Sequence, residues 1–146
     1  MKLEILRGPY QPALAGGFQI DSCRLLTDLS MRCDSGWTPF RPAIIDTGAP
    51  LSLFPRRLWR TAQIRRIGQL RVGGLSRKAE CMLNVTLATF VLAIRDRESE
   101  IGPLECQALL ADNDDVPALL GMQGVLAELT VHTSVGRDEA YLEFAG

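Results

Sequence analysis

Signatures of several well-known enzyme classes are missing from this 146-residue sequence. It has one histidine, His132, which we expect on a strand surface, and no G-x-S-x-G motif, so serine or cysteine hydrolase chemistry is disfavoured. Paired zinc ligands are absent too. Gly68 and Gly73 have P-loop spacing, but Gly74-Leu75 follows where Lys-Ser/Thr is required. The sequence therefore predicts no metal site and no cofactor.

Long apolar runs are also missing. No stretch approaches the roughly 18 apolar residues of a membrane-spanning helix, and residues 1–7 include an acid and no sustained apolar core. We therefore expect no signal peptide, no membrane partner and a cytoplasmic location. The widely spaced cysteines are then expected to be reduced and mostly buried, with a disulfide between Cys23 and Cys33 as the open alternative.

Opposite charges are concentrated in different parts of the sequence. Eight basic residues and no acid lie between residues 56 and 78, acids dominate between 96 and 115, and the net charge is −1. Two solvated faces account for this pattern. The alternatives are halves that complement each other across a dimer, and a basic patch that favours an acidic ligand. A near-neutral chain without a recognisable binding motif predicts no nucleic-acid partner.

The most informative part of the sequence surrounds Asp46. The apolar residues 43–45 indicate a buried strand that ends at this aspartate, and Gly48 with Pro50 indicates a tight turn before a second apolar run at 51–54. A carboxylate at the end of a buried strand is costly unless it is hydrogen-bonded. We expect the backbone N–H of Gly48 to approach closely and donate to it. The alternative is an Asx-type turn in which Asp46 only caps the backbone.

The rest of the chain suggests strands joined by turns, after a loop-rich start. Pro55 favours a short helix that extends to about residue 63, and Gly73-Gly74 between strand-like arms is typical of a hairpin. Further strands are expected at 18–25, 40–45, 81–94, 104–111, 130–135 and 140–144, a polar turn region at 31–39 and a charged loop at 95–103. The length is consistent with one domain.

Two of these segments carry a resemblance to a known family. Ile44-Ile45-Asp46-Thr47-Gly48-Ala49 resembles the active-site signature of aspartic proteases. Leu119-Leu120-Gly121, followed by a helical pattern, resembles a segment near the end of retroviral-type proteases. With the glycine-rich hairpin and the long strands, they occur in the family's order over about residues 40–144. The chain thus resembles the single-domain, retropepsin-like aspartic proteases, including their bacterial relatives.

The resemblance implies a fold and a domain division. The expected fold is mostly β, a closed-barrel-like retropepsin (acid protease) fold with one or two short helices. Residues 40–146 would form the protease domain. Residues 1–39 depart from the family pattern, and we interpret them as an N-terminal extension that packs on the domain or leads into it.

The resemblance also implies roles for individual residues around the signature. Asp46 would be the catalytic residue, Gly48 and Ala49 would hold and orient its carboxylate, and Thr47 would hydrogen-bond across a dimer. The flap, a glycine-rich hairpin that closes over bound peptide and excludes water, would contain Val72, Gly73, Gly74 and Leu75.

The segment that begins at Leu119 would support the loop that carries Asp46. Leu119-Leu120-Gly121 would pack beside the signature loop, and residues 122–129 would form a closing helix in which Val125, Leu126 and Leu129 share one face. Family members often carry an arginine just after that glycine. This sequence has Met122 there, so an ion pair made by that arginine is in doubt.

One signature in 146 residues determines the expected assembly. Aspartic proteolysis needs two carboxylates that share one proton, one acting as a base on water and the other as an acid on the carbonyl. We therefore expect a symmetric homodimer in which each chain contributes Asp46 to an endopeptidase site for peptide or protein substrates. The alternative is a catalytically weak or inactive retropepsin-like module for peptide binding or dimerisation.

Overall fold

The computed structural model describes residues 1–9, 21–73 and 82–144. Strands account for 62% of these residues and helices for 8%, which confirms the expectation of a mostly β fold. No helix in the described part of the chain is long and apolar enough to cross a membrane.

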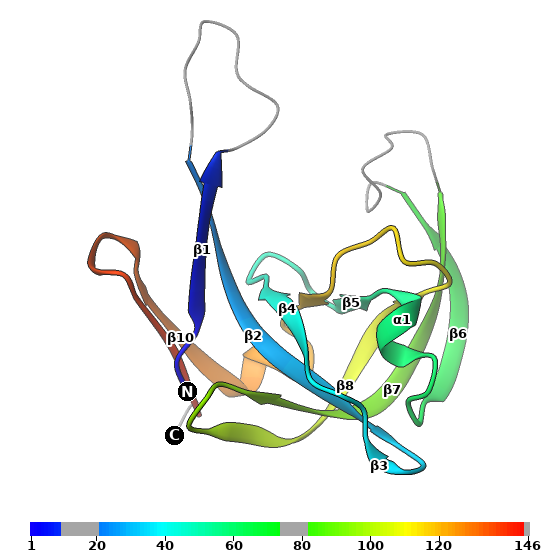
Figure 1. The fold of residues 1–146 in the computed structure, drawn as a ribbon. Coiled ribbons are helices and arrows are strands. Elements are labelled where there is room, and N and C mark those ends of the chain that lie inside the picture. The colour runs from blue at the N-terminus through cyan, green and yellow to red at the C-terminus, as the bar shows by residue number, and fades with distance from the viewer. Residues whose placement is uncertain (10–20, 74–81, 145–146) are drawn as a thin grey trace, which may run out of the picture.

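Most of the strands belong to one sheet that closes into a ring (Figure 1). Its strands are β1 (Glu4–Pro9), β2 (Asp21–Cys33), β3 (Gly36–Trp37), β4 (Arg41–Ile45), β5 (Ser52–Phe54), β6 (Arg65–Val72), β7 (Leu83–Arg95), β8 (Glu100–Ala111) and β9 (Leu119–Leu120). The ring runs β2-β4-β9-β5-β8-β7 and closes where β7 pairs with β2. β1 and β3 pair with β2, and β6 pairs with β7. A separate hairpin contains β10 (Leu129–Ser134) and β11 (Glu139–Phe144).

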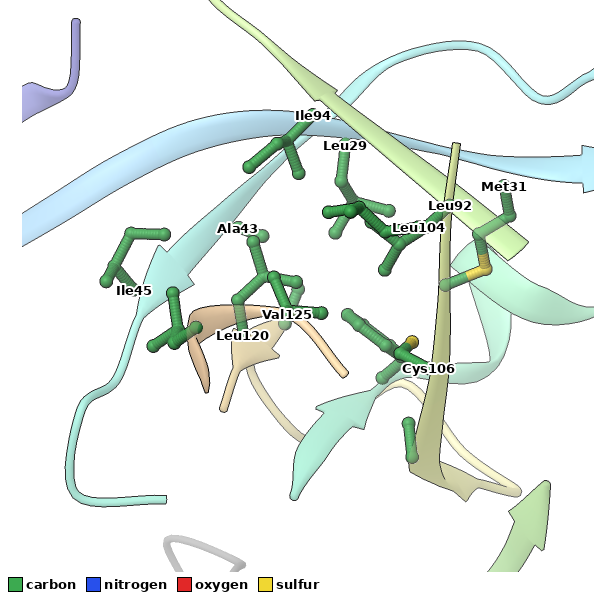
Figure 2. Packing of buried hydrophobic residues seen from close by; sticks show 14 of the residues in the cluster. Leu29, Met31, Ala43, Ile45, Leu92, Ile94, Leu104, Cys106, Leu120 and Val125 are labelled. Atoms are coloured by element: carbon green, nitrogen blue, oxygen red, sulfur yellow. The ribbon is translucent and has the colours of Figure 1, made fainter. Parts of the chain in front are cut away.

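The main core lies inside the ring because side chains alternate between the two faces of each strand. Along β7, Phe90, Leu92 and Ile94 point inward, and along β8 so do Cys106 and Leu110; none of these five is more than 3% exposed. Figure 2 shows such side chains from several strands meeting in one cluster. Fully burying a side chain of this size contributes about 1.5–3 kcal/mol, so this cluster holds the ring closed.

A smaller apolar cluster, called the outer cluster below, lies on the opposite face of the sheet. Its buried members are Leu53, Leu83, Val85, Ala111 and Val116. Its half-buried members are Val72, Leu109 and Leu119. The outer cluster joins the β6–β7 ribbon to β5 and β9, the strands that lie beside Asp46 in the sheet.

Neither expected helix forms as predicted. The helix after Pro55 is a single turn, α1 (Arg56–Trp59), rather than a helix to about residue 63. The expected closing helix over 122–129 is wrong: this segment contains turns and one 3₁₀ turn, η1 (Leu126–Glu128). Gly124 interrupts it with a left-handed φ of 72°. Val125 and Leu126 are nevertheless buried in the main core, so the apolar spacing reflected packing rather than an α-helix.

Two segments expected to be irregular are largely strand. Of the loop-rich start only residues 1–9 are described, and they contain β1, which pairs along its whole length with β2. In the expected polar turn region, Met31 and Cys33 continue β2 as buried residues, and only a tight turn separates them from β3. The charged loop is reduced to a turn because β8 already begins at Glu100. In each case pairing with a neighbouring strand outweighs a polar local sequence.

The N-terminal residues are built into the same structure as the rest of the chain. The amino group of Met1 donates to the carbonyl oxygen of Leu142 (2.8 Å), and the N–H of Leu3 donates to that of Ala140 (2.9 Å). The Leu3 side chain is 2% exposed in the main core. β1 and β2 therefore connect the terminal hairpin to the ring.

The described cysteines are free thiols. Cys33 and Cys106 are buried, as expected, whereas Cys23 is exposed. Cys23 and Cys33 lie at opposite ends of β2 and form no disulfide. Burial, together with the negative charge of Glu105, raises the pKa of the Cys106 thiol to about 12, so this thiol stays protonated and packs as an apolar group.

Asp96 connects the N-terminal segment to the turn between β7 and β8. Its carboxylate accepts hydrogen bonds from the backbone N–H groups of Lys2 (2.6 Å), Glu98 (2.8 Å) and Ser99 (2.6 Å), and from the Ser99 hydroxyl (3.0 Å). Burial opposes ionisation, but these hydrogen bonds outweigh it and hold the pKa of Asp96 well below its usual range. The ionised carboxylate is thus favoured by folding.

Asp96→Ala should therefore lower the free energy of unfolding by about 1 kcal/mol near neutral pH, since solvent screens a partly exposed carboxylate. The difference in free energy of unfolding between Asp96→Ala and wild type should have its full size above about pH 4, the pKa of this carboxyl in the unfolded chain. It should shrink as the pH falls below that value. Urea unfolding followed by circular dichroism measures both effects. Glu98→Ala is the matched control, because Glu98 contributes only its backbone N–H. A difference that grows as the solution is acidified would contradict this account.

Candidate functional site

Asp46 lies directly after β4, at the point where three short strands meet. β9 lies between β4 and β5: Ile44 and Ile45 pair with Leu119 and Leu120 in parallel, and Leu53 pairs with Leu119 in antiparallel orientation. Ile44 and Ile45 alternate between the outer and inner faces of the sheet, and Asp46 is the first residue after the strand. The predicted strand and the position of the carboxylate at its end are confirmed.

Backbone hydrogen bonds clamp the turn after β4 to the segment that contains β9. The N–H of Asp46 donates to the carbonyl oxygen of Leu120 (2.9 Å). Beyond the turn, the N–H of Met122 donates to Ala49 (2.9 Å) and that of Gln123 to Pro50 (3.0 Å). Leu119, Leu120 and Gly121 therefore pack beside the signature loop, as expected, and residues 46–52 are held at both ends.

The carboxylate of Asp46 is oriented from within its own turn. The N–H of Gly48 donates to Oδ1 of Asp46 (3.0 Å), the predicted hydrogen bond, and the N–H of Ala49 donates to the Asp46 carbonyl oxygen (3.2 Å). These two bonds form an Asx-type turn, so the structure agrees with both interpretations of Asp46 given above. Asp46 and Ala49 are partly exposed, and Thr47 and Gly48 are exposed. The carboxylate is thus fixed yet open to molecules outside the chain.

Glycine is not required at position 48 by contacts within the chain. A Cβ built on Gly48 would lie 3.4 Å from Oδ1 of Asp46, an ordinary contact, and the φ of Gly48 is not left-handed. The close approach of the Gly48 N–H to Asp46 therefore does not depend on the missing Cβ.

Gly121, in contrast, is required by its surroundings. A Cβ built there would lie 2.6 Å from both the carbonyl carbon and oxygen of Leu51 and 2.8 Å from the carbonyl oxygen of Ala49. The N–H of Gly121 donates to the hydroxyl oxygen of Ser52 (2.9 Å), which is fully buried. Ser52 is a supporting residue that sequence reasoning missed; the available signal was a single hydroxyl within the apolar run 51–54.

Ser52→Ala should lower the free energy of unfolding by about 1–3 kcal/mol, because the buried N–H of Gly121 would lose its acceptor. Thermal unfolding gives the size of the effect. Ser99→Ala offers a control, since the Ser99 hydroxyl bonds to Asp96 at an exposed turn. An unchanged stability for Ser52→Ala would mean that another group accepts from Gly121.

The β6–β7 ribbon provides the arms of the predicted hairpin. Val72 pairs with Leu83 at the described end of the ribbon, and Val72 is half-buried against the outer cluster. Gly73 is exposed. The predicted flap residues Gly74 and Leu75 lie outside the described residues. In Figure 1 this end of the ribbon and the turn after β4 both lie on the upper side of the ring.

An apolar row connects the ribbon to the turn on the outer face. Ile44, Leu119, Leu53, Leu109 and Leu87 are successive cross-strand partners from β4 to β7. All but Leu53 are half-buried. Since paired residues share a face, the row forms an apolar surface that ends at Ile44, two residues before Asp46.

Two further residues are placed as follows. Met122, which stands where the family often has arginine, is 39% exposed and contributes its backbone N–H to the clamp. His132 lies on β10, stacks on Tyr141 and is hydrogen-bonded to Glu143 (2.6 Å). The expectation of a strand-surface histidine is confirmed.

Comparison of the chain with protein-family models, with curated proteins and with solved structures found no match.

Proposed function

We propose that this protein is a retropepsin-like aspartic endopeptidase whose active site forms between two identical chains. The observation that carries the proposal is the clamp between the Asp46 turn and residues 119–123. The clamp fixes the turn at the end of a buried strand, the N–H of Gly48 orients one carboxylate within that turn, and the tip of the turn stays exposed. A site prepared for a second copy of the same turn needs both properties.

The exposed tip of the turn supports the dimeric arrangement. Thr47 and Gly48 are exposed, and the absence of a Cβ at Gly48 leaves the approach to Asp46 unobstructed. A two-fold axis through this point would bring Asp46 of both chains together without a second signature in the sequence. Thr47 would then be positioned to hydrogen-bond across the axis.

The paired carboxylates would divide the chemistry between them. Two carboxylates in contact cannot both ionise readily, so they share one proton. The ionised carboxylate takes a proton from a water molecule, which attacks the carbonyl carbon of the peptide bond. The protonated carboxylic acid donates its proton to the carbonyl oxygen. The first carboxyl, now protonated, then donates its proton to the amide nitrogen, and the second, now ionised, takes a proton from a hydroxyl of the tetrahedral intermediate. The C–N bond breaks, a carboxylic acid and an amine are released, and the pair is returned to its starting state.

The surroundings of the turn indicate the substrate. The half-buried row that includes Ile44 and Leu119 offers apolar contacts beside the carboxylate, and Val72 and Gly73 lead to the tip of the β6–β7 ribbon. We expect this ribbon to act as the flap and to exclude water from a bound extended peptide. Peptides with apolar residues next to the scissile bond should be preferred.

Cleavage of a mixed peptide library tests the proposal. Wild-type protein and Asp46→Asn are incubated with the library from mildly acidic to neutral pH, and the products are read by mass spectrometry. Asp28→Asn, which alters an exposed aspartate on β2, is the matched control. Wild type and the control should cleave the same bonds, and Asp46→Asn should not.

Each other outcome counts against the proposal. Cleavage that survives in Asp46→Asn would show that another group or a contaminant is responsible. A lack of cleavage by folded wild-type protein, with folding checked by circular dichroism, would favour a peptide-binding or dimerisation module.

A further inference from the structure

β6 is an edge strand that is exposed along almost its whole length. Among the described strands it pairs with β7 on one side and with none on the other. Of its eight residues only Val72 is half-buried, and the others are exposed. A Cβ built on Gly68 would have no atom within 4 Å. The outer edge of β6 therefore presents backbone N–H and carbonyl groups to which a further strand can bind.

The second half of β6 has the regular backbone that such pairing needs. A bulge lies between Arg66 and Gly68, and residues 68–72 then pair one-to-one with residues 87–83 of β7. Bulges and charged side chains are two means by which edge strands are kept from pairing with other chains. Because the bulge ends at Gly68, the backbone of 68–72 is free of it, and the side chains decide which strand can pair there.

The register with β7 places the side chains of β6 on two different faces. Leu70 pairs with Val85, a buried member of the outer cluster, so Leu70 lies on the outer face, where it is 46% exposed. Arg71 pairs with the adjacent residue, Asn84, and so lies on the opposite face. Arg66 pairs with β7 four residues further along and shares the face of Arg71. The edge is thus apolar on one face and cationic on the other.

The charge of β6 disfavours a second copy of the same strand as its partner. β6 contains three arginines and no acid, and none of these arginines forms an ion pair among the described residues. An antiparallel pair of two β6 strands centred at Gly68 would place Arg65 opposite Arg71. Like charges directly opposite each other destabilise a strand pair, whereas opposite charges stabilise it. The same arginines therefore favour an acidic strand.

We propose that the outer edge of β6 binds an acidic, extended segment of another protein as an added strand. The backbone of this segment pairs with residues 68–72. Acidic side chains four residues apart lie on the face of Arg66 and Arg71, and the apolar side chains between them lie on the face of Leu70. The edge thus selects a segment in which acids occupy one face and β-branched apolar residues occupy the other.

This docking surface is separate from the Asp46 turn. In Figure 1 β6 forms the right-hand edge of the molecule, and β7 lies between it and the rest of the ring. No residue of β6 contributes to the hydrogen bonds that clamp the Asp46 turn. The inference therefore does not depend on the proposed peptidase activity, and Asp46→Asn should bind the segment as wild type does.

Titration with the peptide acetyl-Glu-Val-Thr-Val-Glu-amide, followed by amide chemical shifts of the protein, tests the proposal. The shift changes should saturate, should be centred on residues 68–72 and should weaken as salt is added. The same peptide with lysine in place of both glutamates should not bind at equal concentrations. A fully N-methylated version keeps both acids but has no backbone N–H to donate, and it should bind about tenfold more weakly or worse.

Two arginine variants test the cationic face. Arg66→Gln and Arg71→Gln should each weaken binding of the acidic peptide about twofold to fivefold, the range for exposed ion pairs, and the double variant about tenfold. Both side chains are exposed, so the protein should stay folded, which circular dichroism checks. Arg24→Gln, which changes an exposed arginine of β2, is the matched control and should bind as wild type does.

Three results would overturn the proposal. The first is the absence of saturable shift changes in residues 68–72 of wild-type protein. The second is equal binding of the fully N-methylated peptide, which would show that the arginines attract anions without strand pairing. The third is a change of the same shifts with protein concentration when no peptide is present, which would show that the edge pairs with a second copy of the chain.

Discussion

Mixing wild-type chains with Asp46→Asn chains should reduce peptide cleavage as the square of the wild-type fraction. If each chain supplies one carboxylate, only dimers of two wild-type chains are fully active. Random association at equal amounts gives about one quarter of such dimers. Cleavage by the mixture should thus fall to about one quarter of that of the same total concentration of wild type. Asp46→Asn alone should lose about 10²–10⁴-fold or more of the activity, the contribution of acid–base catalysis.

The measurement requires chains that exchange before assay, so the two proteins are unfolded together and refolded, and initial rates are recorded over a series of ratios. Asp28→Asn chains mixed in the same way should leave the rate unchanged. A linear decrease with the fraction of Asp46→Asn would mean that each chain works alone, and the shared-dyad mechanism would be abandoned. A quadratic decrease would be difficult to explain by any monomeric site.

Local sequence pattern was sufficient for the elements with strong apolar alternation. β7 and β8 follow from their β-branched and aliphatic residues, and the apolar lead-in to Asp46 predicted both β4 and a carboxylate at its end. The hydrogen bond from Gly48 also followed from the turn chemistry, and it does not require glycine, since a Cβ at that position has room. Short-range rules work here because the partners are close in sequence.

Long-range pairing accounts for most of what could not be predicted. β9 has two residues and no strong strand pattern of its own; it exists because β4 and β5 lie on either side of it. The role of Ser52 depends on Gly121, which is 69 residues away in the chain. The expected helix over 122–129 failed because Gly124 is packed against the backbone of Cys106 in a left-handed conformation, a tertiary contact that helical spacing does not reveal.

Because Gly121 is packed directly against backbone, it is the position where adding a single methyl group should disrupt the Asp46 turn most. Gly121→Ala would place a Cβ 2.6 Å from the Leu51 carbonyl, and the colliding atoms are backbone that is itself part of the clamp. Relief requires β9 to move away from the Asp46 turn, which breaks the hydrogen bonds that orient it. We expect a loss of about 3 kcal/mol or more in the free energy of unfolding.

Gly136→Ala provides the matched control, because a Cβ at Gly136 has no atom within 4 Å and the residue is exposed. The free energy of unfolding of Gly136→Ala, measured in urea, should stay within about 0.5 kcal/mol of the wild-type value. If Gly121→Ala unfolds like this control, the close contact between β9 and the Asp46 turn is not as described, and the support for the proposed active site disappears with it. If it is destabilised and Gly136→Ala is not, the clamp is a structural requirement of the turn that carries Asp46, whether or not that carboxylate is catalytic.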